Sequence, residues 1–368
     1  MSSIWDLANP QLRDLGVYEP GKPIEETARE LGTDADHIIK LASNENPLGP
    51  SPKAVAAMRA TLETAHLYPD GGGYYLRDAL ASSLGVSRDH LILGAGSNEI
   101  IEFLGHAFLD RGDDIVTSEH AFVVYRLVAA VFGAHTIEVP ARNFGHDLEA
   151  MTAAVTPKTR LVFVANPNNP TGTLAKQDEM DRFIEKIPPH VVVVIDEAYY
   201  EYLNDPPDSL RFIHAGRNVV ALRTFSKIQG LASLRIGYGI ARPELIQALH
   251  KVRQPFNVTG MAQAAALASL SDDDHRAETK RITDEGRAYL QDQFGAMDLP
   301  FVPSVGNFVL VKVGDGGAIF RALLERRIIV RALKGYKLPE WVRISVGTME
   351  QNQRCIAALK EILASQPH

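Results

Sequence analysis

The chain has 368 residues, of which 45% are hydrophobic and 23% charged, and its formal net charge is −7. The composition is typical of a folded globular protein, and the length favours two domains over a single core. The negative charge argues against nucleic acid as a partner, and one cysteine, Cys355, excludes an intrachain disulfide and a cysteine-based metal site. No histidine lies in an H-E-x-x-H motif, so we expect no metal.

The first residues contain neither a basic segment nor an apolar one, and no uninterrupted apolar run reaches membrane-spanning length. We therefore expect a cytoplasmic protein that does not associate with a membrane.

The chain begins with an irregular stretch containing proline and glycine at 17–23, followed by a predicted helix over 24–31. A Pro/Gly-rich segment at 40–52 interrupts regular structure and marks the entry into the main domain. Helices are then predicted over 52–64 and 75–84, and Gly85 ends the second one.

Apolar runs alternate with helical stretches in the middle of the chain. The helical stretches include 98–109 and 177–187, and the apolar runs occupy residues 90–93, 114–117, 135–139, 160–165, 191–195 and 219–222. Because most of these runs are apolar throughout, both faces of each strand are buried, which predicts a mostly parallel sheet between helices. In such sheets ligands bind at the carboxyl ends of the strands.

The pattern changes after Gly295. A helix at 243–253 and an alanine-rich helical stretch at 261–294 lead out of the sheet, and short strands at 307–311, 328–331 and 341–346 follow with helices at 318–326 and 349–364. We predict an α/β protein with a large domain at 46–255 and a smaller α+β domain at 256–368. An N-terminal arm, residues 1–45, is expected to pack with the small domain.

Polar residues gather where the predicted strands end. The turn Gly94-Ala-Gly-Ser-Asn98 opens a helix, so its N–H groups and the helix dipole favour an anion; Ser97 is either a phosphate donor or an ordinary N-cap. Phe122 either stacks on a planar ligand or packs in the core. In the rigid turn Asn166-Pro-Asn-Asn-Pro-Thr-Gly172, Asn169 either donates to a phenolate oxygen or only shapes the turn.

Two further strand ends carry an acid and an amine. Asp196 ends an apolar run, where a carboxylate is costly unless it caps a helix or meets a cation such as a protonated pyridine nitrogen. Tyr199 could then reach the phenolic oxygen of the same ring. Lys227 is either an ordinary surface lysine or a desolvated amine that condenses with an aldehyde. Ser226 and Arg235 add a hydroxyl group and a positive charge for an anion.

A planar, phosphorylated pyridine aldehyde accounts for these groups together, and pyridoxal 5′-phosphate (PLP) is that compound. The motifs Asn-Asn-Pro-Thr-Gly, Asp-Glu-Ala-Tyr and Ser-Lys resemble those of the aspartate-aminotransferase-like, fold type I PLP-dependent enzymes. The stretches Tyr68-Pro-Asp-Gly and Ile328-Ile-Val-Arg331 are similar to the histidinol-phosphate aminotransferase branch. The resemblance covers nearly the whole chain and implies a PLP-binding large domain.

The resemblance implies roles for the residues around the cofactor. Lys227 would bind the aldehyde covalently and transfer protons, Asp196 would keep the pyridine nitrogen protonated, and Phe122 would stack on the ring. Asn169 and Tyr199 would bind the ring oxygen. The phosphate would be held by four residues of the same chain: Ser97, Asn98, Ser226 and Arg235.

The resemblance also implies residues at the substrate and at a subunit interface. Tyr68 would reach the cofactor phosphate from the neighbouring subunit of a homodimer. Arg343 matches the arginine that most relatives use for a substrate carboxylate. In the histidinol-phosphate branch, Arg343, Arg331 and Tyr18 would instead face the substrate phosphate, with Asn169 beside the substrate.

Two positions depart from the common pattern: Ser233 replaces a usual glycine, and Phe122 replaces a frequent tyrosine. Neither removes a group that the chemistry requires. The implied reaction converts L-histidinol phosphate and 2-oxoglutarate to imidazole-acetol phosphate and L-glutamate, in histidine biosynthesis.

Three alternatives stay open. The first is an aminotransferase for aromatic or other amino acids, in which Arg343 binds a carboxylate. The second is a PLP-dependent decarboxylase of a phosphorylated amino acid. The third is a non-catalytic PLP-sensing domain; known versions carry a DNA-binding module, for which this sequence has neither room before residue 40 nor a basic patch.

Overall fold

The computed structural model describes residues 3–13, 15–16 and 21–365. Its centre is a seven-stranded sheet in the order β2-β8-β7-β6-β5-β3-β4. All neighbours from β7 to β4 are parallel, and only β8 runs antiparallel to both of its neighbours. The predicted mostly parallel sheet is therefore confirmed. Its strands are β2 (Leu91–Gly94), β3 (Asp114–Ser118), β4 (His135–Val139), β5 (Thr159–Ala165), β6 (Val192–Asp196), β7 (Val219–Thr224) and β8 (Gly237–Ala241).

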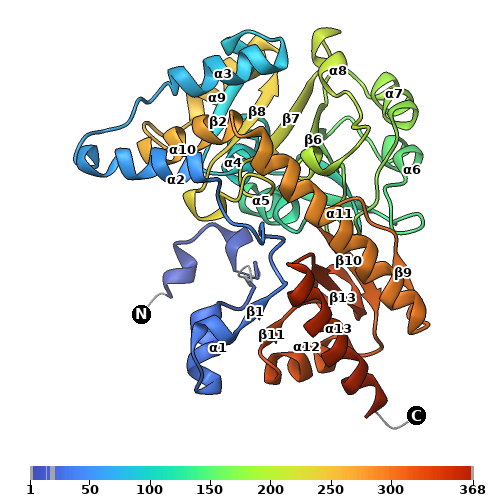
Figure 1. Ribbon diagram of the computed structural model, residues 1–368. Coiled ribbons are helices and arrows are strands. Elements are labelled where there is room, and N and C mark those ends of the chain that lie inside the picture. The colour runs from blue at the N-terminus through green and yellow to red at the C-terminus, as the bar shows by residue number, and fades with distance from the viewer. Residues whose placement is uncertain (1–2, 14, 17–20, 366–368) are drawn as a thin grey trace.

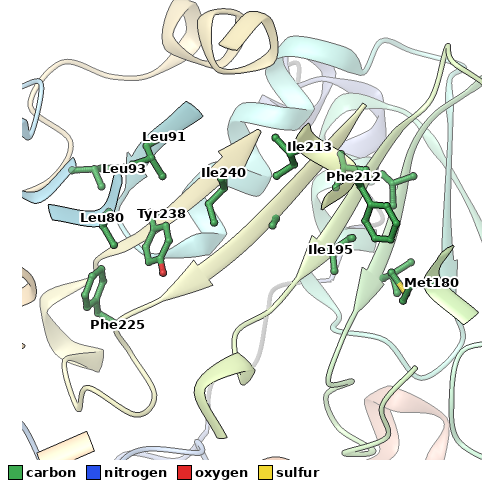
Figure 2. Packing of buried hydrophobic residues seen from close by; sticks show 14 of the residues in the cluster. Leu80, Leu91, Leu93, Met180, Ile195, Phe212, Ile213, Phe225, Tyr238 and Ile240 are labelled. Atoms are coloured by element: carbon green, nitrogen blue, oxygen red, sulfur yellow. The ribbon is translucent and has the colours of Figure 1, made fainter. Parts of the chain in front are cut away.

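Each central strand divides its side chains between two hydrophobic cores, one on each face of the sheet. In β6, for example, Val193 and Ile195 belong to the core shown in Figure 2, whereas Val192 and Val194 belong to the other. The core of Figure 2 is covered by α2 (Pro52–Ala60), α3 (Tyr74–Leu84), α6 (Leu148–Ala153), α7 (Gln177–Lys186), α8 (Leu210–His214) and α10 (Gly260–Leu270). The opposite core is covered by α4 (Ser97–Phe108), α5 (Val124–Phe132) and α9 (Pro243–Val252).

Strand β8 is absent from the apolar runs of the sequence, because two of its five residues are glycines. Glycine is required at Gly237, where an added Cβ would lie 2.6 Å from the backbone nitrogen of Ser97. The strand therefore passes directly beneath the start of α4, and this close approach helps to form the site described below.

A four-stranded antiparallel sheet in the order β12-β13-β10-β9 forms a second, smaller unit. One face packs on α11 (Asp273–Ala296), α12 (Gly316–Glu325) and α13 (Met349–Ala364), and α11 runs from beside the large sheet to this unit (Figure 1). The other face packs against Val123 and Phe144, which come from the large sheet's side of the molecule. The strands of the small sheet are β9 (Phe301–Val302), β10 (Phe308–Lys312), β12 (Arg331–Leu333) and β13 (Leu338–Ser345).

The strand predicted over 328–331 is wrong in its extent. It consists of two strands in different sheets: β11 (Ile328–Ile329) pairs with β1 (Ile39–Lys40), whereas β12 begins at Arg331 and pairs with β13. The change of sheet at Val330 places Arg331 in the small sheet, opposite Arg343 of β13.

The segment before the large sheet runs along the small one. After α1 (Ile24–Leu31), β1 pairs with β11, and the carbonyl group of Leu41 accepts a hydrogen bond from the Ser345 amide at 2.9 Å. Figure 1 shows β1 and β11 side by side. Domain boundaries at residues 45 and 255 remain a prediction. Among the described residues, no helix combines the length and apolar character needed to cross a membrane.

Candidate active site

A cavity of about 250 Å³ lies where β5, β6 and β7 end, between the large sheet and the small one. It brings together residues that lie far apart in the sequence. The predicted site residues that line it are Ser97, Asn98, Phe122, Asn169, Asp196, Tyr199, Ser226, Lys227, Arg235, Arg331 and Arg343.

Of the predicted site residues that the structure describes, Tyr68 alone does not line this cavity. Tyr68 is 83% exposed and stacks on Phe256, with 4.8 Å between the ring centres. Its predicted contact across a subunit interface stays a prediction. Tyr18 lies outside the described residues.

Lys227 follows β7 and extends into the cavity. Its Nζ donates a hydrogen bond to the carbonyl oxygen of Ser43 at 3.3 Å. Burial in the cavity and, to a lesser extent, the positive charge of Arg343 together lower the Lys227 pKa to about 8, against the opposing effect of Glu45. A lysine in this environment provides a neutral amine near physiological pH, which is the form that attacks an aldehyde.

Asp196 is the last residue of β6 and is 6% exposed. Its Oδ2 accepts a hydrogen bond from the Tyr125 hydroxyl at 2.7 Å, and its Oδ1 accepts one from the Ala198 amide at 3.2 Å. Burial raises the Asp196 pKa despite these donors. A cationic partner in the cavity would therefore stabilise the charged carboxylate.

One end of the cavity offers donors to an anion. The N-cap of α4 is Gly96, with φ of 80°, so the N-cap reading of Ser97 is wrong; Ser97 is the first helical residue. A Cβ on Gly96 would lie 2.2 Å from Nη2 of Arg235. Because the glycine has no side chain, Arg235 can lie against the turn, and its Nη1 donates to Ser226 Oγ at 3.3 Å. Helix N–H groups, a hydroxyl group and a guanidinium group thus converge.

The other end of the cavity carries two arginines. Arg331 and Arg343 are paired residues on the neighbouring strands β12 and β13. The Arg343 guanidinium group is buried and donates to Asn169 Oδ1 and to the carbonyl oxygen of Ala42. The cavity therefore has cationic groups at both ends.

The cavity also contains residues to which the sequence analysis assigned no role. Tyr125 lies in the first turn of α5, and its ring meets that of Phe122, which precedes the helix, edge to face with 5.8 Å between the ring centres. Ser43, Asn44 and Glu45 belong to the Pro/Gly-rich segment at 40–52, which was interpreted only as the entry into the main domain. The additional lining residues include Ser43, Asn44, Glu45, Tyr125, Thr224 and Tyr336.

Comparison with known proteins agrees with this geometry. The model of the family "Aminotransferase class I and II" matches residues 36–359. The chain is 51% identical over 98% of its length to the histidinol-phosphate aminotransferase of Akkermansia muciniphila, covering 100% of that protein. It is 50% identical over 94% of its length to the enzyme of the same name from Moorella thermoacetica, covering 90% of that protein.

A solved structure is also similar over nearly the whole chain. It is the crystal structure of histidinol-phosphate aminotransferase from Sinorhizobium meliloti in complex with pyridoxal-5′-phosphate, with a TM-score of 0.89 and 29% identity. The similarity covers 97% of this chain and 98% of that one. The chain belongs to the class I and II aminotransferases, and within them to the histidinol-phosphate aminotransferase family.

Proposed function

We propose that the protein binds PLP in this cavity and transfers the amino group of L-histidinol phosphate to 2-oxoglutarate in the cytoplasm. The products are imidazole-acetol phosphate and L-glutamate, as in histidine biosynthesis. The observation that carries the proposal is the charge pattern of the cavity. An amine and a buried carboxylate lie between two cationic ends, and PLP and histidinol phosphate each bring one phosphate group.

The residues present fit PLP. The α4 N-terminus, Ser226 and Arg235 would hold its phosphate, and Asp196 would pair with its ring nitrogen. Tyr199 and Asn169 would hold the ring oxygen, with Phe122 against the ring. When bound, the cofactor supplies an electron sink for the carbon that loses its proton.

Lys227 has two tasks in the proposed reaction. Its neutral amine would first hold the cofactor at the aldehyde carbon, with the aldehyde oxygen leaving as water. Once the substrate amine has displaced it, the free Lys227 amine would accept the proton of the substrate carbon that bears the amino group and donate a proton to the former aldehyde carbon. A pKa of about 8 suits both tasks, because the amine gains and loses a proton near neutral pH.

Arg331 and Arg343 would bind the substrate phosphate. A guanidinium group offers two parallel N–H donors to phosphate oxygens, and two such groups match a dianion. The names of the relatives support histidinol phosphate over an amino acid with a single carboxylate.

The test is a half-reaction with the PLP-loaded protein, followed by the visible absorption of the cofactor. We expect L-histidinol phosphate to convert the cofactor to its amino form with a much higher kcat/KM than L-phenylalanine. Unphosphorylated L-histidinol is the matched control and should react far more slowly. Equal or faster conversion by L-phenylalanine would favour an aromatic aminotransferase instead.

The proposal includes a homodimer in which Tyr68 of each subunit reaches the phosphate in the other subunit's cavity. Its support is the exposure of Tyr68 and of nearby apolar residues on the same surface, among them Phe256, Tyr74 and Tyr75.

A further inference from the structure

Asn44 joins the small sheet to the large one at the wall of the cavity. The residue is 1% exposed and has a left-handed φ of 56°. Its Nδ2 lies 2.8 Å from the hydroxyl oxygen of Tyr199, which follows β6, and its Oδ1 lies 2.7 Å from Oγ of Ser345, the last residue of β13. A single amide therefore contacts both units.

The contacts of Ser345 fix the orientation of this amide. The backbone N–H of Asn44 donates to Ser345 Oγ at 2.9 Å, so the hydroxyl proton of Ser345 is directed to Asn44 Oδ1. With the amide reversed, that buried proton would lose Asn44 Oδ1, which is its only acceptor in the described part of the chain, and this is unfavourable. Oδ1 therefore faces Ser345, and Nδ2 faces Tyr199.

The backbone of Asn44 is held as well. Its carbonyl oxygen accepts a hydrogen bond from Asn307 Nδ2 at 2.9 Å, and the carbonyl oxygen of nearby Leu41 accepts one from the Ser345 amide at 2.9 Å. Both donors come from the small sheet or the residue preceding it. The amide can therefore neither rotate nor shift without breaking contacts to this sheet.

This orientation determines where the proton of Tyr199 points. An amide N–H only donates, so the hydroxyl oxygen of Tyr199 accepts from Asn44 and its own proton points away from Asn44. Tyr199 lines the cavity, and in the described part of the chain no other group forms a hydrogen bond with its hydroxyl. The proton is thus directed into the cavity.

We propose that Asn44 is a positioning residue that makes the Tyr199 hydroxyl a hydrogen-bond donor to the ring oxygen of the bound cofactor. Ser345 in turn holds Asn44 in the orientation that allows this. The inference rests on the proposed function, because the acceptor in the cavity is the oxygen of PLP.

The test compares two substitutions of Asn44 in the apoprotein at pH 8. Asn44→Asp keeps the shape of the side chain, but a carboxylate only accepts hydrogen bonds. The Tyr199 hydroxyl would then donate its proton to this carboxylate instead of into the cavity. Asn44→Ala removes the donor but leaves that proton free to face the cavity. We expect Asn44→Asp to weaken PLP binding by about tenfold or more, and Asn44→Ala to weaken it less.

A purely structural role predicts the opposite order. Alanine would leave a void and be strained at a φ of 56°, whereas aspartate nearly preserves the volume and tolerates left-handed backbone. The dissociation constant of PLP, from quenching of protein fluorescence, and the thermal midpoint of the apoprotein separate the two roles. A weaker PLP complex for Asn44→Ala than for Asn44→Asp would overturn the proposal.

Tyr199→Phe controls for the charge that aspartate introduces. If Asn44 acts through the Tyr199 hydroxyl, Asn44→Asp should have little further effect on PLP binding in the Tyr199→Phe background. The same loss in both backgrounds would show that charge alone acts and would overturn the proposal. Ser345→Ala removes the hydroxyl group that fixes the orientation of the Asn44 side-chain amide. This variant should also weaken PLP binding, but less than Asn44→Asp does.

These outcomes separate the inference from the proposed function. If the unsubstituted protein does not bind PLP, both fail. If it binds PLP and Tyr199→Phe weakens the complex while the order of the Asn44 variants is reversed, only the role of Asn44 fails.

Discussion

Lys227 has a low pKa because of where its side chain ends. Burial removes water from the ammonium group, and Arg343 adds a positive charge nearby, so the neutral amine is favoured. Asp196 and Glu45 oppose this effect without cancelling it. The same arginine that is proposed to bind the substrate phosphate therefore also prepares the nucleophile.

The pH dependence of PLP capture by the apoprotein tests this arrangement. The Lys227 pKa is lowered from 10.5 to about 8, so the fraction of neutral amine should rise about tenfold per pH unit up to about pH 8 and then level off. Stopped-flow absorbance measures the rate. Arg343→Gln should move the midpoint to higher pH, because a positive neighbour is removed. A midpoint near pH 10 in the unsubstituted protein would contradict the account.

Arg331 offers a second prediction about a single residue. Arg331→Gln should lower kcat/KM for L-histidinol phosphate by roughly ten- to a hundredfold, the effect of losing hydrogen bonds to a charged group. The rate with unphosphorylated L-histidinol should change little, since that substrate has no phosphate to lose. Equal losses with both substrates would show that Arg331 only maintains the structure.

At the scale of elements, the positions of Asp196 and Lys227 depend on the adjacent strands β6 and β7. Glu197 and Arg223, at the ends of β6 and β7, form an ion pair of 2.8 Å with side chains only 3% and 6% exposed. Ser209 donates a further hydrogen bond to Glu197 at 2.6 Å. The pair joins the strands next to Asp196 and Lys227, so it fixes the ends that carry the reactive groups.

Breaking this pair should destabilise the protein. Glu197→Gln leaves the buried Arg223 charge without its partner, and we expect a loss of about 3 kcal/mol in the free energy of unfolding. Urea denaturation of the apoprotein measures it. Glu285→Gln, which removes an exposed pair with Arg281 on α11, is the control and should leave the midpoint unchanged. Equal midpoints for the two variants would contradict the expected loss.

The elements that the sequence predicts well are those with continuous apolar runs. Strands β5, β6 and β7 are such runs, and the order of their polar ends indicated the site. Strand β8 contains too much glycine to give that signal, and the break at Val330 depends on pairing with β1, a segment far away in the sequence. The contacts of Asn44 with Tyr199 and Ser345 cannot be predicted from the sequence either, because they join three segments that lie far apart in the chain.

At the scale of the whole molecule, the cavity needs both sheets. The large sheet supplies Asp196 and Lys227, and the small sheet supplies Arg331 and Arg343. Tyr68 is not part of the cavity in its own chain. The proposed homodimer would therefore complete the phosphate end of each site with a residue from the other subunit.

Mixed dimers test this sharing. Lys227→Ala and Tyr68→Ala dimers should each have low activity, for lack of the amine and of the phosphate contact. Unfolding and refolding the two together should restore activity, because one site of each mixed dimer combines the intact Lys227 of one subunit with the intact Tyr68 of the other. No recovery, with mixed dimers shown by mass spectrometry, would place Tyr68 outside the neighbouring site.

The central claim is that Lys227 carries the cofactor. Borohydride reduction of the PLP-loaded protein fixes the bond between amine and aldehyde carbon, and peptide mass spectrometry then locates the attached group. The account predicts the label on the peptide containing Lys227 and on no other lysine. A label on a different lysine, or no label on a protein that turns over L-histidinol phosphate, would contradict it.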